Sequence, residues 1–221
     1  MQQVAPARSV SKRETSKAKR KQRILFEARA IIAADGFEAF KLRDLAERSD
    51  LTVPTIYNLI GGKDDILKLI IGDMVEKLLE VQNRAGSDNV EASFERQIHD
   101  LAELFAEDQD YYRAAFIAGD RSGLFEQQSD VGIFARFVQL PVEACKTAQA
   151  IGLLLGNISA DQLGRQIYGS YRLARQDWVH GYFDLDGFRS QALTGIFLCL
   201  AADANPEFRQ RLMERLDWLR S

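Results

Sequence analysis

The chain has few of the residues on which enzymes and metal proteins usually depend. Its 221 residues include two histidines, His99 and His180, and two cysteines, Cys145 and Cys199. The cysteines stand in separate apolar helical patterns without CxxC spacing, which indicates buried small hydrophobic residues rather than a disulfide or metal pair. The sequence also lacks HExxH, GxSxG, P-loop and glycine-rich dinucleotide motifs. We therefore expect a protein that is not an enzyme and that holds no metal and no cofactor.

Long apolar runs are also missing. The longest one, residues 151–158, is far shorter than the roughly 20 residues that a membrane-spanning helix needs, and no secretory signal pattern opens the chain. Hydrophobic residues make up 46% and charged residues 28% of the sequence, which is typical of a globular protein. We expect a soluble, cytoplasmic protein without a membrane partner.

The charge is small in total but unevenly distributed. The net charge is −3, yet residues 1–63 contain 13 basic and 7 acidic residues, a net of +6, while the remaining 16 basic and 25 acidic residues give residues 64–221 a net of −9. Eight of the basic residues fall within residues 1–23, against the single acid Glu14. A basic segment on an acidic body indicates a polyanionic partner at one end; a solubilising tail is the alternative.

Apolar residues recur at helical spacing almost throughout, and no stretch alternates with the period of a strand, so the sequence predicts an all-α fold. We expect a basic, flexible arm over residues 1–18, a three-helix helix-turn-helix domain over 19–63, and a helical domain over 64–221. The expected helices cover residues 19–34, 42–48, 53–60, 63–84, a stripe at 94–105, 111–118, 131–154 with a kink at Pro141, 160–182, 185–204 and 206–219.

The third helix follows a well-formed start signal. In the stretch LTVPTIYNLI, residues 51–60, Thr52 is placed to cap the helix and Pro54 falls at its second position, where it forfeits no hydrogen bond. Leu51 and Ile56 have the spacing of a hydrophobic staple. We expect Ile56, Leu59 and Ile60 to face inward. The outer and end surfaces of the helix then carry five uncharged residues, some polar and some apolar. That set is Val53, Pro54, Thr55, Tyr57 and Asn58.

A short helix, a three-to-four-residue turn and a second short helix are the elements of a helix-turn-helix, whose last helix enters the DNA major groove. The segment LRDLAERSDLTVPTIYNLIGGKDDIL, with Gly36-Phe37 and Ile24-Leu25 before it, resembles the amino-terminal domain of the TetR family of bacterial repressors. The resemblance covers about residues 20–70. This chain has Asp50 where the family usually has glycine, Lys41 where Ser or Thr commonly caps the second helix, and Leu59-Ile60 in place of the frequent His-Phe.

The resemblance implies a role in DNA binding for several residues. Thr55, Tyr57 and Lys63 would donate hydrogen bonds to phosphate oxygens, with the amino-terminal end of the following helix beside Lys63. Val53 and Pro54 could press on thymine methyl groups, and the amide of Asn58 suits adenine. Alternatively, Tyr57 is a half-buried core residue, and Val53 and Pro54 only start the helix. The full predicted DNA-binding set is Lys41, Arg43, Thr52, Val53, Pro54, Thr55, Tyr57, Asn58 and Lys63.

For the carboxy-terminal part, the resemblance implies an effector pocket and a dimer interface. Candidates for the pocket are polar or aromatic residues on apolar helical faces: His99, Tyr112, Arg113, Phe116, Phe134, Phe137, Asn157 and Arg172. Candidates for the interface are Tyr168, Tyr171, Trp178, Leu193, Ile196, Phe197 and Leu200. Core packing within one subunit explains the interface candidates nearly as well. Gly164, Gly169 and Gly195 reduce helix stability, and a close approach between packed helices is one reason to tolerate them.

The sequence therefore predicts a homodimeric, ligand-responsive regulator, a repressor that leaves double-stranded operator DNA when a small molecule binds. The many phenylalanines favour an apolar or aromatic effector. The alternative is a dimeric helical module that binds a small molecule or a partner protein and has no specific DNA recognition.

Overall fold

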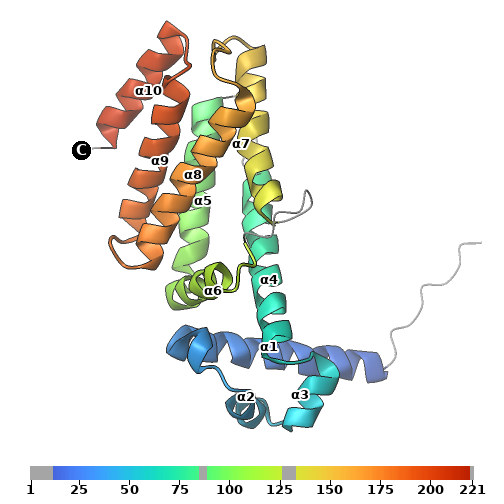
Figure 1. Ribbon diagram of the computed structural model, residues 1–221. Coiled ribbons are helices and arrows are strands. Elements are labelled where there is room, and N and C mark those ends of the chain that lie inside the picture. The colour runs from blue at the N-terminus through green and yellow to red at the C-terminus, as the bar shows by residue number, and fades with distance from the viewer. Residues whose placement is uncertain (1–11, 85–88, 126–132, 220–221) are drawn as a thin grey trace, which may run out of the picture. The chain divides into compact units, whose positions relative to one another are not determined.

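The computed structural model describes residues 12–84, 89–125 and 133–219, and this part of the chain is built from α-helices (Figure 1). The helices are α1 (Lys12–Ala39), α2 (Leu42–Ser49), α3 (Val53–Leu59), α4 (Lys63–Arg84), α5 (Val90–Ala106), α6 (Gln109–Arg121), α7 (Ile133–Ala150), α8 (Ala160–Val179), α9 (Leu185–Ala201) and α10 (Pro206–Trp218). The expected all-α fold is confirmed. Over the same residues, no helix has the length and apolar character needed to cross a membrane.

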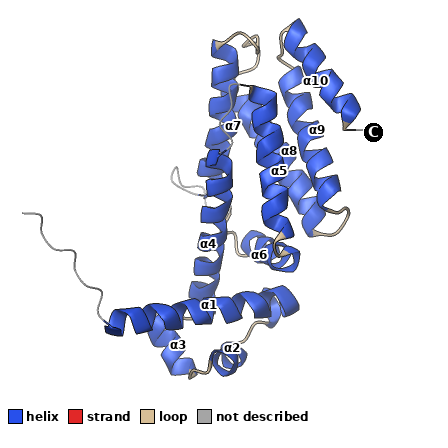
Figure 2. Cartoon of the chain, turned by 180° about the vertical axis from the view of Figure 1, so that it is seen from behind, coloured by secondary structure: helices blue, strands red, loops and turns tan. Residues whose placement is uncertain are grey.

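The chain forms two compact units, which divide within α4 between Ile71 and Gly72. In the first unit, α2 and α3 lie on the same side of α1 (Figure 2). An apolar stripe on α1 is buried at Ile24, Ala28 and Ile32, each 0% exposed. A stripe of this spacing gives a helix one face that is removed from water when it packs, and this burial drives the association.

Two features of α1 differ from the expectation. The helix begins at Lys12 rather than near residue 19, so residues 12–18 are helical rather than part of an arm. Residues 1–11, the rest of the expected arm, lie outside the described residues. At the other end, Gly36 interrupts the helix with φ 75° and ψ 164°, a conformation open to glycine because it has no Cβ. Gly36 thereby ends the regular helix close to the expected residue 34, and a short helical turn continues to Ala39.

In the second unit, α8 packs between α7 and α9, and α9 also contacts α5 and α10 (Figure 1). Aromatic side chains fill the space where α5, α6, α8 and α9 meet. Phe105 is stacked on Trp178, with ring centroids 4.9 Å apart, and Phe116 and Phe188 lie within 5.5 Å of Phe105. All four are fully buried or nearly so. Removal of one such ring from a core typically costs about 3–5 kcal/mol.

Two of the three glycines in α8 and α9 allow close helix packing. A Cβ on Gly164 would lie 2.6 Å from the backbone nitrogen of Val142, and a Cβ on Gly195 would lie 2.5 Å from the Ser170 Cβ. The expected close approach is therefore confirmed for α7 on α8 and for α8 on α9. Gly169 differs, because no described atom lies within 4 Å of a Cβ built there. Packing within the described subunit does not explain Gly169.

The ends of α7 and α9 come earlier than the apolar pattern predicts. Gly152, at φ 77°, ends α7, and the Leu153 N–H bonds back to the Ala148 carbonyl at 2.9 Å, which is the hydrogen bond of a Schellman motif. The loop that follows is held by the buried carboxylate of Asp203, which accepts from the N–H groups of Gly156 at 2.8 Å and Asn157 at 2.9 Å. These bonds fix the loop before α8 to the residues just after α9.

Candidate DNA-binding and effector sites

The turn before α3 has the geometry that its sequence predicts. Asp50 adopts the left-handed conformation at φ 55° and ψ 46°, which Asp tolerates better than most residues other than glycine. Thr52 is extended, and its hydroxyl oxygen accepts from the Thr55 N–H at 3.4 Å. Pro54 lies in the first turn of α3, and Ile56 is completely buried. The cap, the proline and the inward residue together fix where α3 starts and which face it exposes.

The exposed surface of α3 consists largely of uncharged donors and apolar groups. Pro54 and Asn58 are exposed, Val53 and Thr55 are half-buried, and Tyr57 is 55% exposed. The exposure of Tyr57 favours the DNA-contact interpretation over the buried-core one. Leu59 and Ile60, which we expected to face inward, are both half-buried rather than fully buried.

The hydroxyl groups of Thr52 and Thr55 form a pair at the start of α3, with 2.8 Å between their oxygens. Each hydroxyl has one proton to donate, and one of the two protons satisfies the other oxygen. The second proton is left for an acceptor outside the pair. A phosphate oxygen is such an acceptor, and the contact would position the helix without reading a base.

At the start of α4, polar groups form hydrogen bonds within the protein. The Lys63 ammonium donates to the Glu38 carbonyl at 3.3 Å and lies 4.5 Å from the centre of the Phe37 ring. The Gly62 N–H donates to the Asp65 carboxylate at 2.9 Å. Lys63 therefore caps the end of α1 from its position at the start of α4. Its ammonium has three protons, so it can also donate a hydrogen bond to an anion.

Other basic residues of the first unit lie at both ends of α2 and along α1. Lys41 precedes α2 in an extended conformation, and within the described chain its side chain forms no capping hydrogen bond. Lys41 is exposed, as is Arg43 on the first turn of α2. Arg48, which the sequence did not single out, is paired with Glu27 of α1 at 3.2 Å and so holds α2 to α1. Seven of the eight basic residues within 1–23 fall in the range of α1 rather than before it.

The eight candidate effector residues are not brought together. Tyr112 and Phe116 belong to the buried aromatic cluster, and the Arg113 guanidinium lies 5.2 Å from the Trp178 ring centre. Asn157 is in the loop held by Asp203, and Arg172 is on the exposed side of α8. Of the other three candidates, His99 lines a surface groove and Phe137 lines an internal cavity. The side chain of Phe134 lies outside the described residues.

The internal cavity lies among α4, α5, α7, α8 and α9 and has a volume of about 20 Å³. Its walls are aromatic and aliphatic, with a few polar groups. The lining residues are Gln82, Phe94, Gln97, Ile98, Phe137, Pro141, Ile167, Tyr168, Tyr171 and Ile196. A space of this size holds about one water molecule. Among the described residues, no group of three or more His, Cys, Asp or Glu side chains is placed to hold a metal ion.

Gln82 is one of two glutamines that line this cavity and that the sequence pattern did not indicate, the other being Gln97. The Gln82 side chain is 7% exposed, and its Oε1 has no hydrogen-bond partner among the described residues. Burial raises the pKa of the phenols of Tyr168 and Tyr171, so both stay neutral hydroxyls over the physiological range. Gln82 does follow Met74 and Leu78 in the buried register of α4, so a polar residue at an apolar position was the available signal.

The seven residues predicted for the dimer interface all lie in the core of the subunit. None of them is more than 8% exposed, and Trp178, Phe197 and Leu200 are 0% exposed. Core packing, the alternative that the sequence left open, accounts for these side chains. Exposed apolar residues occur elsewhere on the same helices, at Leu173 of α8 and Leu198 of α9.

The geometry of the first unit defines a helix-turn-helix DNA-binding protein: a capped recognition helix presents uncharged donors, and basic side chains lie on the helices around it. Residues 24–70 match the family model described as "Bacterial regulatory proteins, tetR family". Residues 24–70 therefore carry the DNA-binding domain of the tetR family, and the chain is a DNA-binding transcriptional regulator.

Solved structures share the fold over most of the chain. One is a γ-butyrolactone receptor described as ArpA-like (13% identity, 92% of this chain and 97% of that one, TM-score 0.62). Two others are PfmR of Thermus thermophilus (20% identity, 80% and 97%, TM-score 0.61) and CprB of S. coelicolor A3(2) (15% identity, 90% and 97%, TM-score 0.64). No curated protein sequence matches the chain closely enough to count as a relative.

Proposed function

We propose that the protein is a homodimeric repressor that binds operator DNA through α3 and leaves it when a small, largely apolar molecule enters the internal cavity. The exposed, capped α3 with its uncharged donors carries the DNA part of this proposal. No catalytic role is proposed. Because the partner is chromosomal DNA, the proposed place of action is the cytoplasm.

In the proposed complex, the two copies of α3 enter successive major grooves on one face of the duplex, about 34–36 Å apart. Tyr57 and one threonine proton would bind phosphates, while Val53, Pro54 and Asn58 would meet base edges. The attraction to the polyanion comes from outside α3, from Lys41, Arg43 and the basic residues of α1. Of these, Lys17, Lys19, Arg20 and Arg23 are exposed.

The internal cavity is the proposed effector site because it combines apolar walls with a buried acceptor that lacks a partner among the described residues. A cavity of about 20 Å³ cannot hold an effector, since small-molecule sites commonly measure about 300–1,000 Å³. A ligand would therefore have to separate the helices around it, including α4. The amides of Gln82 and Gln97 and the neutral hydroxyls of Tyr168 and Tyr171 suit an uncharged ligand with hydroxyl or carbonyl groups. That a γ-butyrolactone receptor has this fold supports the presence of a ligand site.

The proposed dimer surface is the exposed side of α8 and α9. Leu173 is 61% and Leu198 is 54% exposed, and Gly169 is open on its outer side. Two such helices from each subunit would form an isologous four-helix interface. In that interface Gly169, which nothing in the described subunit explains, would permit close approach of the partner's helix.

The DNA proposal is tested by selection of bound duplexes from a random pool, followed by mobility-shift titrations at several salt concentrations. We expect one palindromic sequence to be preferred and its binding to survive salt that removes random DNA. A helical binding module without specific recognition would instead bind weakly, without a preferred sequence, and would lose all binding as salt rises.

Removal of positive charge from α1 isolates the contribution of that helix. Exchanging Lys17 and Arg20 for glutamine should flatten the salt dependence of operator binding by up to about 0.9 log unit of slope for each phosphate that is no longer neutralised. The matched control exchanges Arg209 and Arg96, exposed arginines of the second unit. An unchanged slope in the α1 variant would show that these side chains do not contact phosphates.

Mutation of an exposed leucine tests the dimer surface. Leu173→Glu should convert the dimer to monomers in size-exclusion chromatography with light scattering, because two buried charges would face each other across the twofold axis. Ile151→Glu, at a residue that is 58% exposed outside α8 and α9, is the matched control and should remain dimeric. A Leu173→Glu protein that stays dimeric places the interface elsewhere.

A further inference from the structure

A surface groove on the second unit has the features of a second ligand site. This α10 groove lies between α5, α9 and α10, has a volume of about 870 Å³ and shares no lining residue with the internal cavity. We propose that it binds small aromatic carboxylates. Its volume is within the range of about 300–1,000 Å³ for small-molecule sites, and it is open without any movement of helices.

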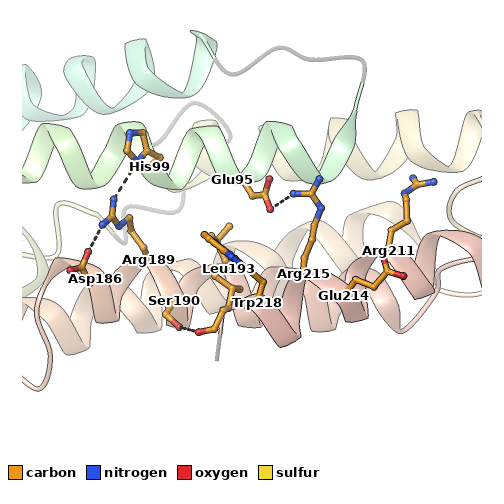
Figure 3. A pocket seen from close by; sticks show the side chains of 11 residues that line it. Glu95, His99, Asp186, Arg189, Ser190, Leu193, Arg211, Glu214, Arg215 and Trp218 are labelled. Carbon is orange, nitrogen blue, oxygen red and sulfur yellow. Dashed lines mark hydrogen bonds and ion pairs between the residues drawn. The ribbon is translucent and has the colours of Figure 1, made fainter. Parts of the chain in front are cut away.

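The groove offers an aromatic ring a binding surface. Trp218, at the end of α10, is 75% exposed, and Leu193 of α9, which is only 8% exposed, lines the same groove (Figure 3). A ligand ring against this pair would cover the indole and remove apolar surface from water. The other tryptophan, Trp178, is fully buried in the aromatic cluster, so the two indoles report on different regions.

Two of the three arginines in the groove are committed to the fold. The Arg211 Nε is 2.9 Å from the Glu91 carboxylate, which is 1% exposed, so release of Arg211 would leave a buried charge without a partner. Arg215 is bound to Glu95, and both side chains are about one-third exposed. Displacement of either pair by a ligand carries a desolvation cost.

Arg189 is the exchangeable arginine. Its carboxylate partner is Asp186, one turn earlier in α9, whose side chain is 78% exposed. Exposed pairs of this kind contribute little to stability, so a ligand carboxylate can replace Asp186 while every buried pair stays in place. Arg189 also lies 3.3 Å from His99 Nδ1, which keeps the guanidinium oriented across the groove (Figure 3).

The positions of these groups select the ligand class. Figure 3 shows Arg189 on one side of Leu193 and Trp218, with Arg215 on the other side. A planar molecule can lay its ring on Trp218 and Leu193 while its carboxylate forms paired hydrogen bonds with the Arg189 guanidinium. An uncharged molecule with the same ring would keep the stacking contact but not the charged one.

The test uses 2-naphthoate as the probe and 2-naphthamide as its uncharged counterpart. In ¹⁵N-labelled full-length protein, 2-naphthoate should shift the indole N–H signal of Trp218 and leave that of Trp178 in place. Calorimetry should show that 2-naphthamide binds at least about tenfold more weakly, the difference that a charge-assisted pair makes.

Four variants distinguish binding in the α10 groove from binding elsewhere on the protein. Arg189→Gln should remove the preference for 2-naphthoate, while Arg96→Gln, at an exposed arginine of α5 outside the groove, should keep it. Asp186→Asn should tighten 2-naphthoate binding, since it removes the competing carboxylate, and a gain in affinity cannot come from misfolding. Gln82→Met, in the internal cavity, should leave binding unchanged.

The proposal is overturned if the Trp218 signal does not move, if the two probes bind equally, or if Gln82→Met abolishes binding while Arg189→Gln preserves it. The last result would locate the probe in the internal cavity. None of these measurements involves DNA, so the α10 groove can fail while the regulator proposal stands, and the reverse.

Discussion

Replacement of Gln82 by methionine should make the protein more stable and also unresponsive to its effector. The Gln82 Oε1 is buried without a partner among the described residues, and such an atom costs about 1–3 kcal/mol of desolvation. Methionine is also unbranched, has similar helix propensity and has no group to satisfy. The expected gain is about 1–2 kcal/mol, or roughly 3–6 °C in Tm for a protein of this size.

The measurement is denaturant and thermal unfolding of the ligand-free protein, together with release of operator DNA by the effector. Gln149→Met is the matched control, because the Gln149 Nε2 donates to the Ile158 carbonyl at 2.9 Å and its removal should destabilise by about 1 kcal/mol. If both variants lose stability, the Gln82 amide is satisfied in the folded protein and the reasoning is wrong. If Gln82→Met gains stability but still releases DNA normally, the effector binds elsewhere.

Three further predictions concern other regions. Tyr57→Phe should weaken binding to every duplex by a similar factor, roughly two- to tenfold for the loss of one neutral hydrogen bond. Asn58→Ala should instead change the order in which duplexes are preferred in competition mobility-shift assays. If Tyr57→Phe weakens binding to some duplexes much more than to others, Tyr57 does not contact a phosphate. Lys63→Met should lower both DNA affinity and, by about 1 kcal/mol, stability to denaturant, because Lys63 also holds the Glu38 carbonyl; unchanged stability would exclude the capping role. Burial raises the pKa of the Cys145 thiol to about 12, from an ordinary value of 9.0. The free energy of unfolding that the wild-type protein has beyond Cys145→Ala should therefore be greatest below pH 9.0 and decrease as the pH rises above it. A difference in unfolding free energy that does not change with pH would contradict this prediction.

Local chemistry explains why several turns and helix starts were predictable in both units. The Thr52 cap, the left-handed Asp50 and the Ser159–Gln162 capping box before α8 each depend on atoms within four residues along the chain. The sequence therefore carries these features directly, and the starts of α3, α4, α8 and α10 agree with the structure. Helix ends were less predictable where a glycine overrides an apolar pattern that continues past it, as at Gly152.

Side-chain environment in the second unit was less predictable, because it depends on which neighbours a helix acquires. α8 packs on both α7 and α9, so apolar residues cover more than one of its faces, and a sequence pattern cannot tell a core face from a subunit interface. Tyr168 and Trp178 therefore look like interface residues and are core residues. The cavity is lined by residues of five helices, and the spacing of residues along the sequence does not show which helices pack together.

The proposed regulation requires a small energy, and α4 contains both groups on which it depends. Gln82, in the last turns of α4, lines the internal cavity, while Lys63, in its first turn, holds the end of α1 through the Glu38 carbonyl. Allosteric coupling of about 1–3 kcal/mol changes affinity by about 5- to 150-fold, and the exposed Lys63–Glu38 hydrogen bond is worth about 1 kcal/mol. A ligand that displaces α4 far enough to break the Lys63–Glu38 bond would therefore account for induction without any larger rearrangement. On this scheme, Lys63→Met should reduce the ratio of operator affinities measured without and with effector, whereas Arg43→Gln should weaken both affinities and leave their ratio unchanged.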